Sequence, residues 1–260
     1  MTPEELQSAG LRYQVDDGVA TITLDRPEVR NAQTPAMWRA LARLGEEIPD
    51  DVAVVVVRGE GEAFSSGLDR RVLEPEGGEE TITALLAQSD EQLSATIEQY
   101  QRGFTFLRDP RFVSIAAVHG FAIGAGFQLA LACDLRILTD DAELSMKEAT
   151  LGLVPDLTGT KPLVDSVGYA RALEICATAR MIHATEAVDL GLALMAVRTE
   201  ELDDTVADLV GALTAPTAGA VRETKALLLE AGGRTLEEQR RYEREAQIRR
   251  FRELARAMTR

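Results

Sequence analysis

The sequence is short of the residue types on which several classes of protein depend. It has two cysteines, Cys133 and Cys176, too few for a disulfide framework. Both lie in apolar stretches, which predicts small buried side chains in a reducing compartment. Its two histidines, His119 and His183, have no cysteine or histidine partner at metal-ligand spacing. We therefore expect neither a disulfide scaffold nor a bound metal.

Positive charge is also scarce. The 260 residues carry 28 basic and 43 acidic side chains, a formal net charge of −15. Nucleic-acid phosphates are bound by clustered basic surface, so this balance argues against a nucleic-acid-binding protein. Residues 234–260 nevertheless hold nine arginines and five glutamates, so an acidic body precedes a basic end. These arginines either pair with acidic surface or, with Arg26, Arg30 or Arg70, bind the phosphates of a small ligand.

Targeting and membrane signals are lacking as well. The first residues are acidic and polar where a signal peptide needs a basic start and an apolar run, so we expect a cytoplasmic protein. The apolar stretch 113–133 is long enough for a membrane span, but His119, Gln128 and three central glycines interrupt it. A short strand, a glycine turn and a helix explain the stretch better, and we expect no membrane association.

Strand and helix patterns alternate along most of the chain and predict an α/β core over residues 1–200. Strands at LRYQV and VATITL flank the turn Asp16-Asp17-Gly18, and Thr34-Pro35 begins a helix. Further elements are expected as a buried strand at 53–57, a loop at 59–80, a helix from about Thr81 to Leu107, and strands at FVSIAAV and DLRIL.

Helical patterns dominate the end of the chain, and residues 201–260 are expected to form a separate helical region. Phe251, Leu254, Ala255 and Met258 give its last segment an apolar stripe at helical spacing. The stripe predicts a helix that docks through this face.

Two glycine-containing loops each follow a buried strand. They are Phe64-Ser65-Ser66-Gly67-Leu68-Asp69 and the segment from His119 to Gln128. Backbone N–H groups at a helix start lack intrahelical acceptors, and glycine lets a ligand oxygen come close to them. Two such donors could meet on one carbonyl oxygen and stabilise an enolate as an oxyanion hole. The alternative is that both loops are ordinary turns between a strand and a helix.

Other known motifs that use glycine or serine do not fit. A dinucleotide fingerprint needs a third glycine where this chain has Leu129. The sequence contains neither the Gly-x-Ser-x-Gly elbow of serine hydrolases nor a phosphate-binding GxxxxGK[ST] loop.

Four segments follow one another in a fixed order between residues 12 and 230: RPEVRNA, AFSSGLD, HGFAIGAGFQLALACDLRI and MKEATLGLVPDLTGTKPL. Together they resemble the crotonase (enoyl-CoA hydratase/isomerase) superfamily. The resemblance implies a crotonase-like spiral of ββα units with a C-terminal helical trimerisation region, and hence a homotrimer or a dimer of trimers. It also implies an acyl-CoA thioester as substrate, with coenzyme A as part of that substrate and no further cofactor.

The resemblance also implies roles for individual residues. The oxyanion hole would be the backbone N–H groups of Leu68 and Ala125, which would hold the thioester carbonyl. The residues expected to line the bound substrate or its CoA moiety are Arg26, Arg30, Phe64, Ser65, Gly67 and Gly124.

Hydratases of this family hold a water between two glutamates, and this chain keeps only the second. Gln128 stands at the first position and Glu148 at the second. Glutamine can orient a water or a substrate, but it is neither an acid nor a base at physiological pH. A single carboxylate suits a proton shuttle, so isomerisation of an enoyl- or dienoyl-CoA is favoured over hydration.

Asp156 supplies a second carboxylate eight residues after Glu148. Its position matches the aspartate that assists dienoyl-CoA isomerases and the one that acts as nucleophile in aryl-CoA dehalogenases. Two carboxylates can divide acid and base roles if their surroundings separate their pKa values. The alternatives are that Asp156 caps a helix starting near Thr158 and that Glu148 is an exposed helix residue.

Two further functions remain open. One is an enoyl-CoA hydratase of low or unusual activity. The other is an acyl-CoA-binding protein that has lost catalysis, because Gln128 stands where hydratases need a carboxylate.

Overall fold

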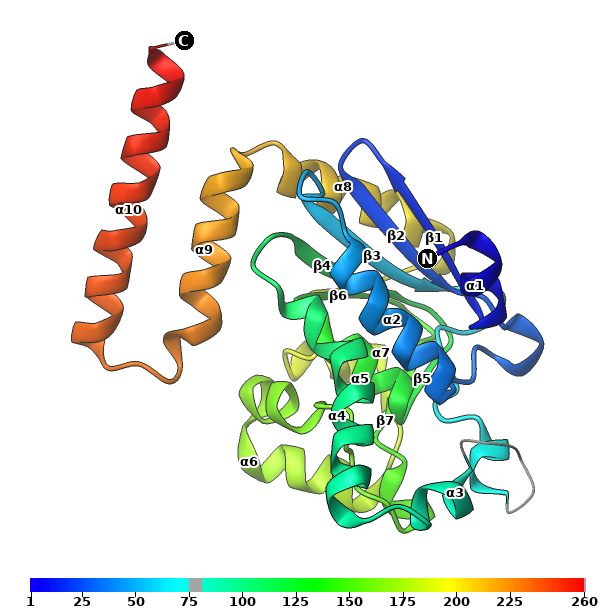
Figure 1. The fold of residues 1–260 in the computed structure, drawn as a ribbon. Coiled ribbons are helices and arrows are strands. Elements are labelled where there is room, and N and C mark those ends of the chain that lie inside the picture. Colours follow the sequence, from blue (N-terminus) through cyan, green and yellow to red (C-terminus); the bar gives the residue numbers. More distant parts are fainter. Residues whose placement is uncertain (75–80, 260) are drawn as a thin grey trace.

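The computed structural model describes residues 1–74 and 81–259 and shows an α/β body with two helices standing beside it (Figure 1). The main sheet has the strand order β1-β2-β3-β4-β6-β9, and a smaller sheet has the order β5-β7-β8. The strands are β1 (Leu11–Asp16), β2 (Val19–Leu24), β3 (Val54–Gly59), β4 (Val113–Val118), β5 (Phe121–Ile123), β6 (Leu135–Thr139), β7 (Glu143–Ser145), β8 (Ile182–His183) and β9 (Met195–Val197). The expected α/β class is confirmed.

The main sheet begins as a hairpin and continues in parallel. β1 and β2 are antiparallel, and Asp17 and Gly18 in their turn have φ angles of 43° and 74°. Positive φ at both turn residues suits the twist of a hairpin, as the Asp-Gly signal predicts. From β2 to β9 every neighbouring pair of strands in this sheet is parallel. β3 is covered on both faces, which explains its unbroken run of valines.

Helices cover both faces of the main sheet. One face carries the larger core, with α2, α4 and α5, and α8 covers the other face through Leu202 and Val206. The helices of the body are α1 (Pro3–Ser8), α2 (Pro35–Glu47), α3 (Ile82–Leu86), α4 (Asp90–Thr105), α5 (Ala125–Ala132), α6 (Thr160–Thr178), α7 (Ala184–Asp189) and α8 (Leu202–Thr214). Short 3-10 helices are η1 (Pro27–Val29), η2 (Arg70–Leu73), η3 (Phe106–Arg108), η4 (Glu148–Leu151) and η5 (Thr199–Glu201).

The single helix expected from Thr81 to Leu107 is wrong, because the chain forms two helices there. Ser89 begins α4: its hydroxyl accepts a hydrogen bond from Gln92 N–H, and Gln92 Oε1 accepts one from Ser89 N–H. This capping box separates α3 from α4. Residues 75–80 of the expected 59–80 loop lie outside the described residues. Cys133 is fully buried as expected, whereas Cys176 is only half-buried.

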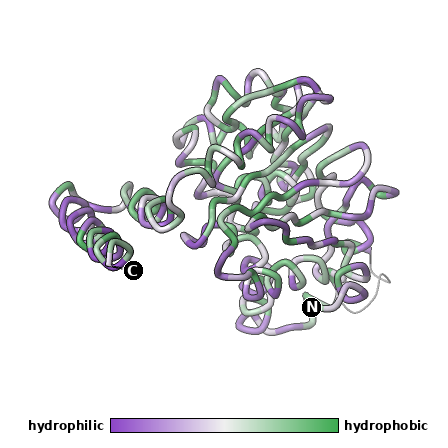
Figure 2. The backbone as a smooth tube through the Cα atoms, turned by 90° about the horizontal axis from the view of Figure 1, so that it is seen from above, coloured by the Kyte–Doolittle hydropathy of each residue, from purple (hydrophilic) through white to green (hydrophobic). Residues whose placement is uncertain are grey.

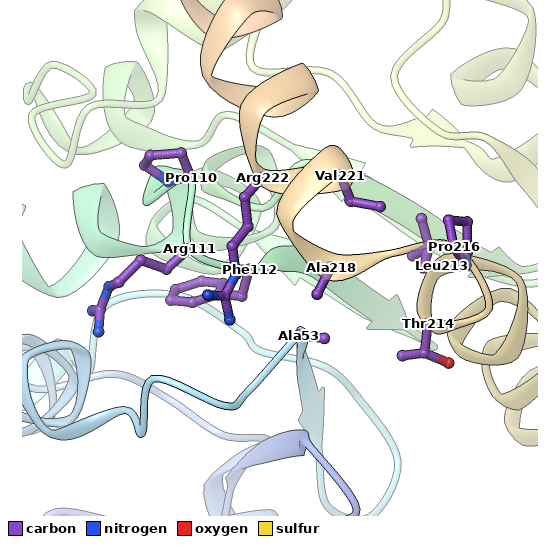
Figure 3. A pocket seen from close by; sticks show the side chains of 10 residues that line it. All are labelled: Ala53, Pro110, Arg111, Phe112, Leu213, Thr214, Pro216, Ala218, Val221 and Arg222. Carbon is purple, nitrogen blue, oxygen red and sulfur yellow. The ribbon is translucent and has the colours of Figure 1, made fainter. Parts of the chain in front are cut away.

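The chain leaves the body after α8, later than the expected boundary at residue 200, because α8 packs on the sheet. α9 (Ala218–Ala231) and α10 (Leu236–Met258) then form an antiparallel pair, with α10 on the far side of α9 in both views (Figures 1 and 2). Lys225 of α9 fastens the pair to the body: its buried Nζ donates to Asp109 O, Phe112 O and Asp134 Oδ2, each at 2.7 Å. Figure 3 shows Arg222 of α9 next to Phe112 at this junction.

The predicted C-terminal helix is confirmed, and the apolar stripe through which it is expected to dock is exposed in the single chain. Phe251 is 62% exposed and Met258 84% exposed, since α10 packs mainly against α9 among the described elements. Arg249 of α10 forms an ion pair with Glu223 of α9, at 2.7 Å between Nε and Oε1. The apolar stripe of α10 is therefore left uncovered within one chain.

Candidate active site

A cavity of about 340 Å³ lies where the two glycine loops meet. Gly67 and Leu68 line it from the first loop, and Gly124 and Ala125 from the second. The other residues that line it are Trp38, Ser66, Arg70, Ile123, Gln128, Lys147, Glu148, Thr150, Leu151, Leu153, Asp156 and Leu157. The cavity at the junction of α8 and α9 in Figure 3 measures only about 20 Å³, little more than the space of a water.

The two loops run side by side because their backbones are hydrogen-bonded. Ser65 N–H donates to Phe121 O at 2.8 Å, and Ile123 N–H donates to Ser65 O at 3.0 Å. On the other edge, Gln33 N–H donates to Gly67 O and Asp69 N–H donates to Gln33 O. These two bonds involve the carbonyl of Gly67 and the N–H of Asp69, the residues before and after Leu68. The N–H of Leu68 itself is therefore turned away from Gln33.

Gly67 allows the loops to come this close. Its φ is +88°, and a Cβ added there would lie 2.4 Å from Ile123 O and 3.5 Å from Ala125 N. Ala125 is the first residue of α5, where N–H groups have no intrahelical acceptor. Leu68 and Ala125, the two expected backbone donors, thus line one cavity. Only the second comes from a helix start, because η2 begins at Arg70, after Leu68.

A buried polar network holds the first loop in place. Ser65 Oγ donates to Asn31 O at 2.8 Å and accepts from Gln33 Nε2 at 3.1 Å and Gly67 N–H at 3.2 Å. Gln33 Oε1 accepts from Trp38 Nε1 at 2.8 Å, and Trp38 lines the cavity. No sequence motif marks Gln33 or Trp38, and only the fold brings them to the loop.

Four residues expected along the substrate, Arg26, Arg30, Phe64 and Ser65, do not line the cavity. Phe64 and Ser65 are fully buried in the wall behind the first loop. Arg26 is held inside the fold, where Nη2 donates to Asp69 Oδ2 at 2.9 Å and Nη1 donates to Ala32 O. Hydrogen bonds from Arg71 and then Arg26 keep the pKa of Asp69 well below its usual range. The fold thus uses the side chains of Arg26, Phe64 and Ser65 internally, and their place along the substrate stays a prediction.

Arg30 and Arg70 are placed differently from Arg26. Both side chains are exposed, and Arg70 lines the cavity. The backbone of Arg30 is tied to the first loop, since its carbonyl accepts from Ser66 N–H at 2.8 Å. Within residues 1–74 and 81–259 neither guanidinium has an ion-pair partner. Two unpaired positive charges therefore remain near the cavity.

Glu148 is buried, so it is not the exposed helix residue of the alternative interpretation. It is 8% exposed at the start of η4, and its Oε1 accepts from Gln128 Nε2 at 2.6 Å. Its Oε2 has no hydrogen-bond partner among the described residues. A Cβ added at Gly124 would lie 3.4 Å from Oε1, so the carboxylate is next to the second loop. Desolvation by burial raises the pKa of Glu148, the Gln128 hydrogen bond opposes this, and the charge of Asp156 adds to it.

Asp156 lies at the rim of the same cavity. Its side chain reaches solvent, yet desolvation by the surrounding protein raises its pKa. Its carbonyl accepts from Gln101 Nε2 of α4 at 2.7 Å. It does not cap a helix, because α6 begins at Thr160 with Gly159 at the N-cap and no side-chain cap. One buried and one exposed carboxylate therefore share the cavity.

Gln128 connects these parts of the site. It is 1% exposed, and its Oε1 accepts from Leu157 N–H at 2.9 Å and Gly159 N–H at 3.2 Å. The amide orientation follows from these contacts, since the oxygen faces two donors and the nitrogen faces a carboxylate. Gln128 thus supports Glu148 on one side and the turn after Asp156 on the other.

Metal binding and membrane insertion can both be judged from the described residues. In the described part of the chain, no three histidine, cysteine, aspartate or glutamate side chains are grouped so that they could hold a metal ion. Nor do the described helices include one with the length and apolar character needed to cross a membrane.

Comparisons with known proteins agree with the fold. The family model described as Enoyl-CoA hydratase/isomerase matches residues 14–259. A peroxisomal Delta(3,5)-Delta(2,4)-dienoyl-CoA isomerase from Arabidopsis thaliana is 34% identical over 226 residues, which cover 85% of this chain and 81% of that protein.

Two solved structures are more similar still, and both are of Thermobifida fusca YX proteins assigned as enoyl-CoA hydratases. One is in complex with CoA, with a TM-score of 0.94, 52% identity and coverage of 98% of each chain. The other is in complex with acetoacetyl-CoA, with a TM-score of 0.93, 54% identity and coverage of 97% of this chain and 98% of that one. The residues matched by the family model include both loops and both carboxylates described above. The chain therefore belongs to the enoyl-CoA hydratase/isomerase family of enzymes, as its four segments predict.

Proposed function

We propose that this enzyme isomerises the double bond of an enoyl- or dienoyl-CoA. One observation carries the proposal: Glu148 is a buried carboxylate beside two backbone donors, and an amide faces it where a hydratase needs a second carboxylate. Its free Oε2 can accept a proton. An arrangement in which an amide, and not a second carboxylate, is hydrogen-bonded to the buried base suits removal and return of the same proton.

The backbone donors would act on the thioester carbonyl. With the oxygen between Leu68 N–H and Ala125 N–H, negative charge that develops on it is stabilised in the transition state. Each such donor contributes about 3 kcal/mol in known oxyanion holes. Both amides are held in advance by the pairing of the two loops, so little reorganisation is needed.

Glu148 would carry the proton. Oε2 takes the proton from C2 of a 3-enoyl-CoA: the C2–H bond breaks, an O–H bond forms, and the electron pair spreads over a dienolate. The proton then returns at C4, which leaves the double bond between C2 and C3. No electrons are gained or lost, so the reaction needs no redox cofactor. The raised pKa of Glu148 makes its carboxylate a stronger base than an exposed glutamate.

Asp156 extends this chemistry to a dienoyl-CoA. In a longer conjugated system the proton returns to a carbon atom that is further from the carbonyl than the carbon atom it left. A second carboxyl group at the rim can deliver it there, and its raised pKa favours the protonated form that delivery needs. The dienoyl-CoA isomerase among the relatives supports this substrate class.

Hydration is the second candidate, favoured by the Thermobifida fusca proteins assigned as enoyl-CoA hydratases. Gln128 cannot remove a proton from water, so Glu148 and Asp156 would have to share that work. We therefore expect hydration to be slower than isomerisation.

The CoA moiety is proposed to bind near the exposed arginines. Arg30 and Arg70 flank the first loop and have no ion-pair partner among the described residues. Arginine suits phosphate recognition because its planar guanidinium can donate two parallel hydrogen bonds. Complexes of the Thermobifida fusca proteins with CoA and acetoacetyl-CoA support an acyl-CoA ligand.

We also propose that the chain assembles as a homotrimer or a dimer of trimers. The uncovered stripe on α10, with Phe251 62% exposed, favours burial against another copy. Sedimentation of the full chain should give three or six times the mass of one chain. A Phe251→Glu variant should lower that mass, and a wild-type monomer would refute the assembly.

Activity is tested with 2-enoyl-, 3-enoyl- and 3,5-dienoyl-CoAs of matched chain length. The products are separated by chromatography and their molecular masses are measured by mass spectrometry. Isomerisation keeps the mass, whereas hydration adds one water. Glu148→Gln should lower turnover by about 10²- to 10⁴-fold and leave thioester binding intact. Full activity in that variant would remove Glu148 from the mechanism.

A second measurement follows the proton. A 3-enoyl-CoA that carries deuterium at C2 should deliver part of the label to C4 if one carboxylate carries it. Products that are mainly hydrated would favour the hydratase. Binding of every thioester without turnover would leave an acyl-CoA-binding protein.

A further inference from the structure

The turn next to Asp156 has a strained backbone. Thr158 has a φ of +71°, a region that β-branched residues rarely adopt and that must be held by surrounding contacts. The two amides that flank Thr158, those of Leu157 and Gly159, are the ones that donate to Gln128 Oε1. Two hydrogen bonds that hold the backbone on either side of the strained residue therefore come from the Gln128 side chain.

The turn is also shaped around Gln128. A Cβ added at Gly159 would lie 2.6 Å from Gln128 Cγ and 3.0 Å from its Oε1. Glycine at this place lets the backbone wrap the side chain closely enough for both amides to reach one oxygen. On the other side of the turn, Gln101 Nε2 donates to Asp156 O at 2.7 Å. Asp156 thus sits between two glutamine contacts, one from α4 and one from α5.

The same Gln128 side chain restricts Glu148. Its Nε2 donates to Oε1 at 2.6 Å, which leaves Oε2 as the carboxylate oxygen without a partner among the described residues. One rigid amide on the first turn of α5 therefore contacts the base directly and holds the segment that presents Asp156. Both contacts require an amide side chain, because its oxygen accepts hydrogen bonds and its nitrogen donates them.

We infer that Gln128 is a positioning residue that clamps the strained Leu157–Gly159 turn and so sets where Asp156 stands relative to Glu148. This inference rests on the proposed function and adds to it a reason for an amide at position 128. A carboxylate there could accept from both backbone amides. It would then face Glu148 without the N–H donor, unless the two carboxyl groups shared a proton.

A double-mutant cycle tests the clamp. Gln128→Met keeps the length of the side chain and removes both hydrogen-bonding groups. Thr158→Gly removes the strain, because glycine adopts a positive φ without steric cost. If the clamp holds the strain, Gln128→Met lets the turn relax and release that strain in the wild-type background, so it should lower the unfolding midpoint less there than in the Thr158→Gly background, which has no strain to release. Equal losses in both backgrounds would overturn the clamp.

The kinetic cycle tests the consequence for the site. With a 3,5-dienoyl-CoA as substrate, Gln128→Met should lower kcat by about tenfold to a hundredfold, as expected for misplacement by about 1 Å, and change KM by less than about threefold. In the Thr158→Gly background the loss of kcat should be several-fold smaller. A rise in KM with unchanged kcat, or equal losses of kcat, would show that Gln128 does not position the carboxylates.

A pH profile separates positioning from general loss of structure. Gln128→Met removes a donor that favours ionised Glu148, so the acidic limb of kcat/KM should move to higher pH, and Thr158→Gly alone should leave it in place. If Gln128→Met does not fold, Gln128→Glu keeps the acceptor for both amides and should fold with the turn intact. An unfolded Gln128→Glu variant would count against the clamp.

Failure of the proposed function looks different from failure of the clamp. Wild-type protein that binds thioesters without turnover would refute the isomerase. The unfolding cycle, which uses no substrate, would then still decide whether Gln128 holds the turn.

Discussion

Replacing Ser65 with alanine should weaken both the fold and the oxyanion loop. The hydroxyl is fully buried and makes three hydrogen bonds, to Asn31 O, from Gln33 Nε2 and from Gly67 N–H. Alanine removes the oxygen and fills little of its space. It leaves an acceptor and two donors without their partner, in a place that water does not reach.

The size of the stability loss follows from these contacts. Each buried polar group left without a partner costs about 1–3 kcal/mol, and neighbouring side chains relax to recover part of it. We expect Ser65→Ala to lower the free energy of unfolding by about 2–4 kcal/mol. A typical domain has about 5–15 kcal/mol, so the variant should still fold.

The effect on turnover comes through Leu68. Gly67 N–H bonds to Ser65 Oγ, and the next amide is the proposed donor to the thioester oxygen. Complete loss of such a donor costs about 10²- to 10³-fold in kcat. Because Ser65→Ala displaces the donor without removing it, we expect a loss of about tenfold to a hundredfold, with KM changed much less.

Three measurements check this prediction. Urea unfolding gives the stability, steady-state kinetics give kcat and KM, and isotope-edited infrared spectra give the C=O stretch of a bound thioester. A weaker oxyanion hole polarises the carbonyl less, so the stretch should shift to higher frequency in Ser65→Ala. Ser66→Ala is the matched control for stability, since Ser66 Oγ makes one exposed hydrogen bond, to Val29 O at 3.2 Å. A Ser65→Ala variant with wild-type stability, kcat and carbonyl frequency would refute the role of the network.

Two further predictions concern charge. Burial raises the folded-state pKa of Glu148, so the stability that this group contributes is present below the pKa of an unfolded glutamate, about 4.3, and is lost as pH rises through the folded-state value. Glu148→Gln should therefore be more stable than wild type near pH 8 and not near pH 4, and urea titrations at both pH values would detect the opposite sign. Lys225→Met should lower the free energy of unfolding by about 3–5 kcal/mol, because it leaves Asp134 without its buried partner at 2.7 Å. Lys161→Met is the control: this side chain is 80% exposed, so the same unfolding assay should show a change of less than about 0.5 kcal/mol.

Local signals in the sequence were reliable where the structure depends on neighbours in the chain. The Asp-Gly turn, the Thr34-Pro35 helix start and the valine run of β3 formed as expected. Their hydrogen bonds and burial patterns are decided within a few residues. The single helix predicted from Thr81 to Leu107 was wrong because helical periodicity does not show where one helix ends and the next begins. The capping box at Ser89, which is also a local signal, marks the start of α4.

Arg26 shows where sequence reasoning stops. Its segment resembles a substrate-binding motif, but its guanidinium is bonded to Asp69, 43 residues away. No local pattern reveals such a pairing. The sequence therefore could not show that the Arg26 side chain is hydrogen-bonded within the fold. Arg30 and Arg70 can be separated from Arg26 only by their exposure in the folded chain.

The sequence by itself determined the family, the α/β class and the residue types at the site, because all three depend on motifs and on local periodicity. Only the tertiary structure decided how those residues work together. It buried Glu148 against Gln128, 20 residues earlier in the chain, and it bent the backbone at Thr158 so that two amides meet the same glutamine. It also left the apolar stripe of α10 uncovered. Burial, pKa and the orientation of an amide depend on what the rest of the chain packs around a residue, and this is set only when distant segments meet.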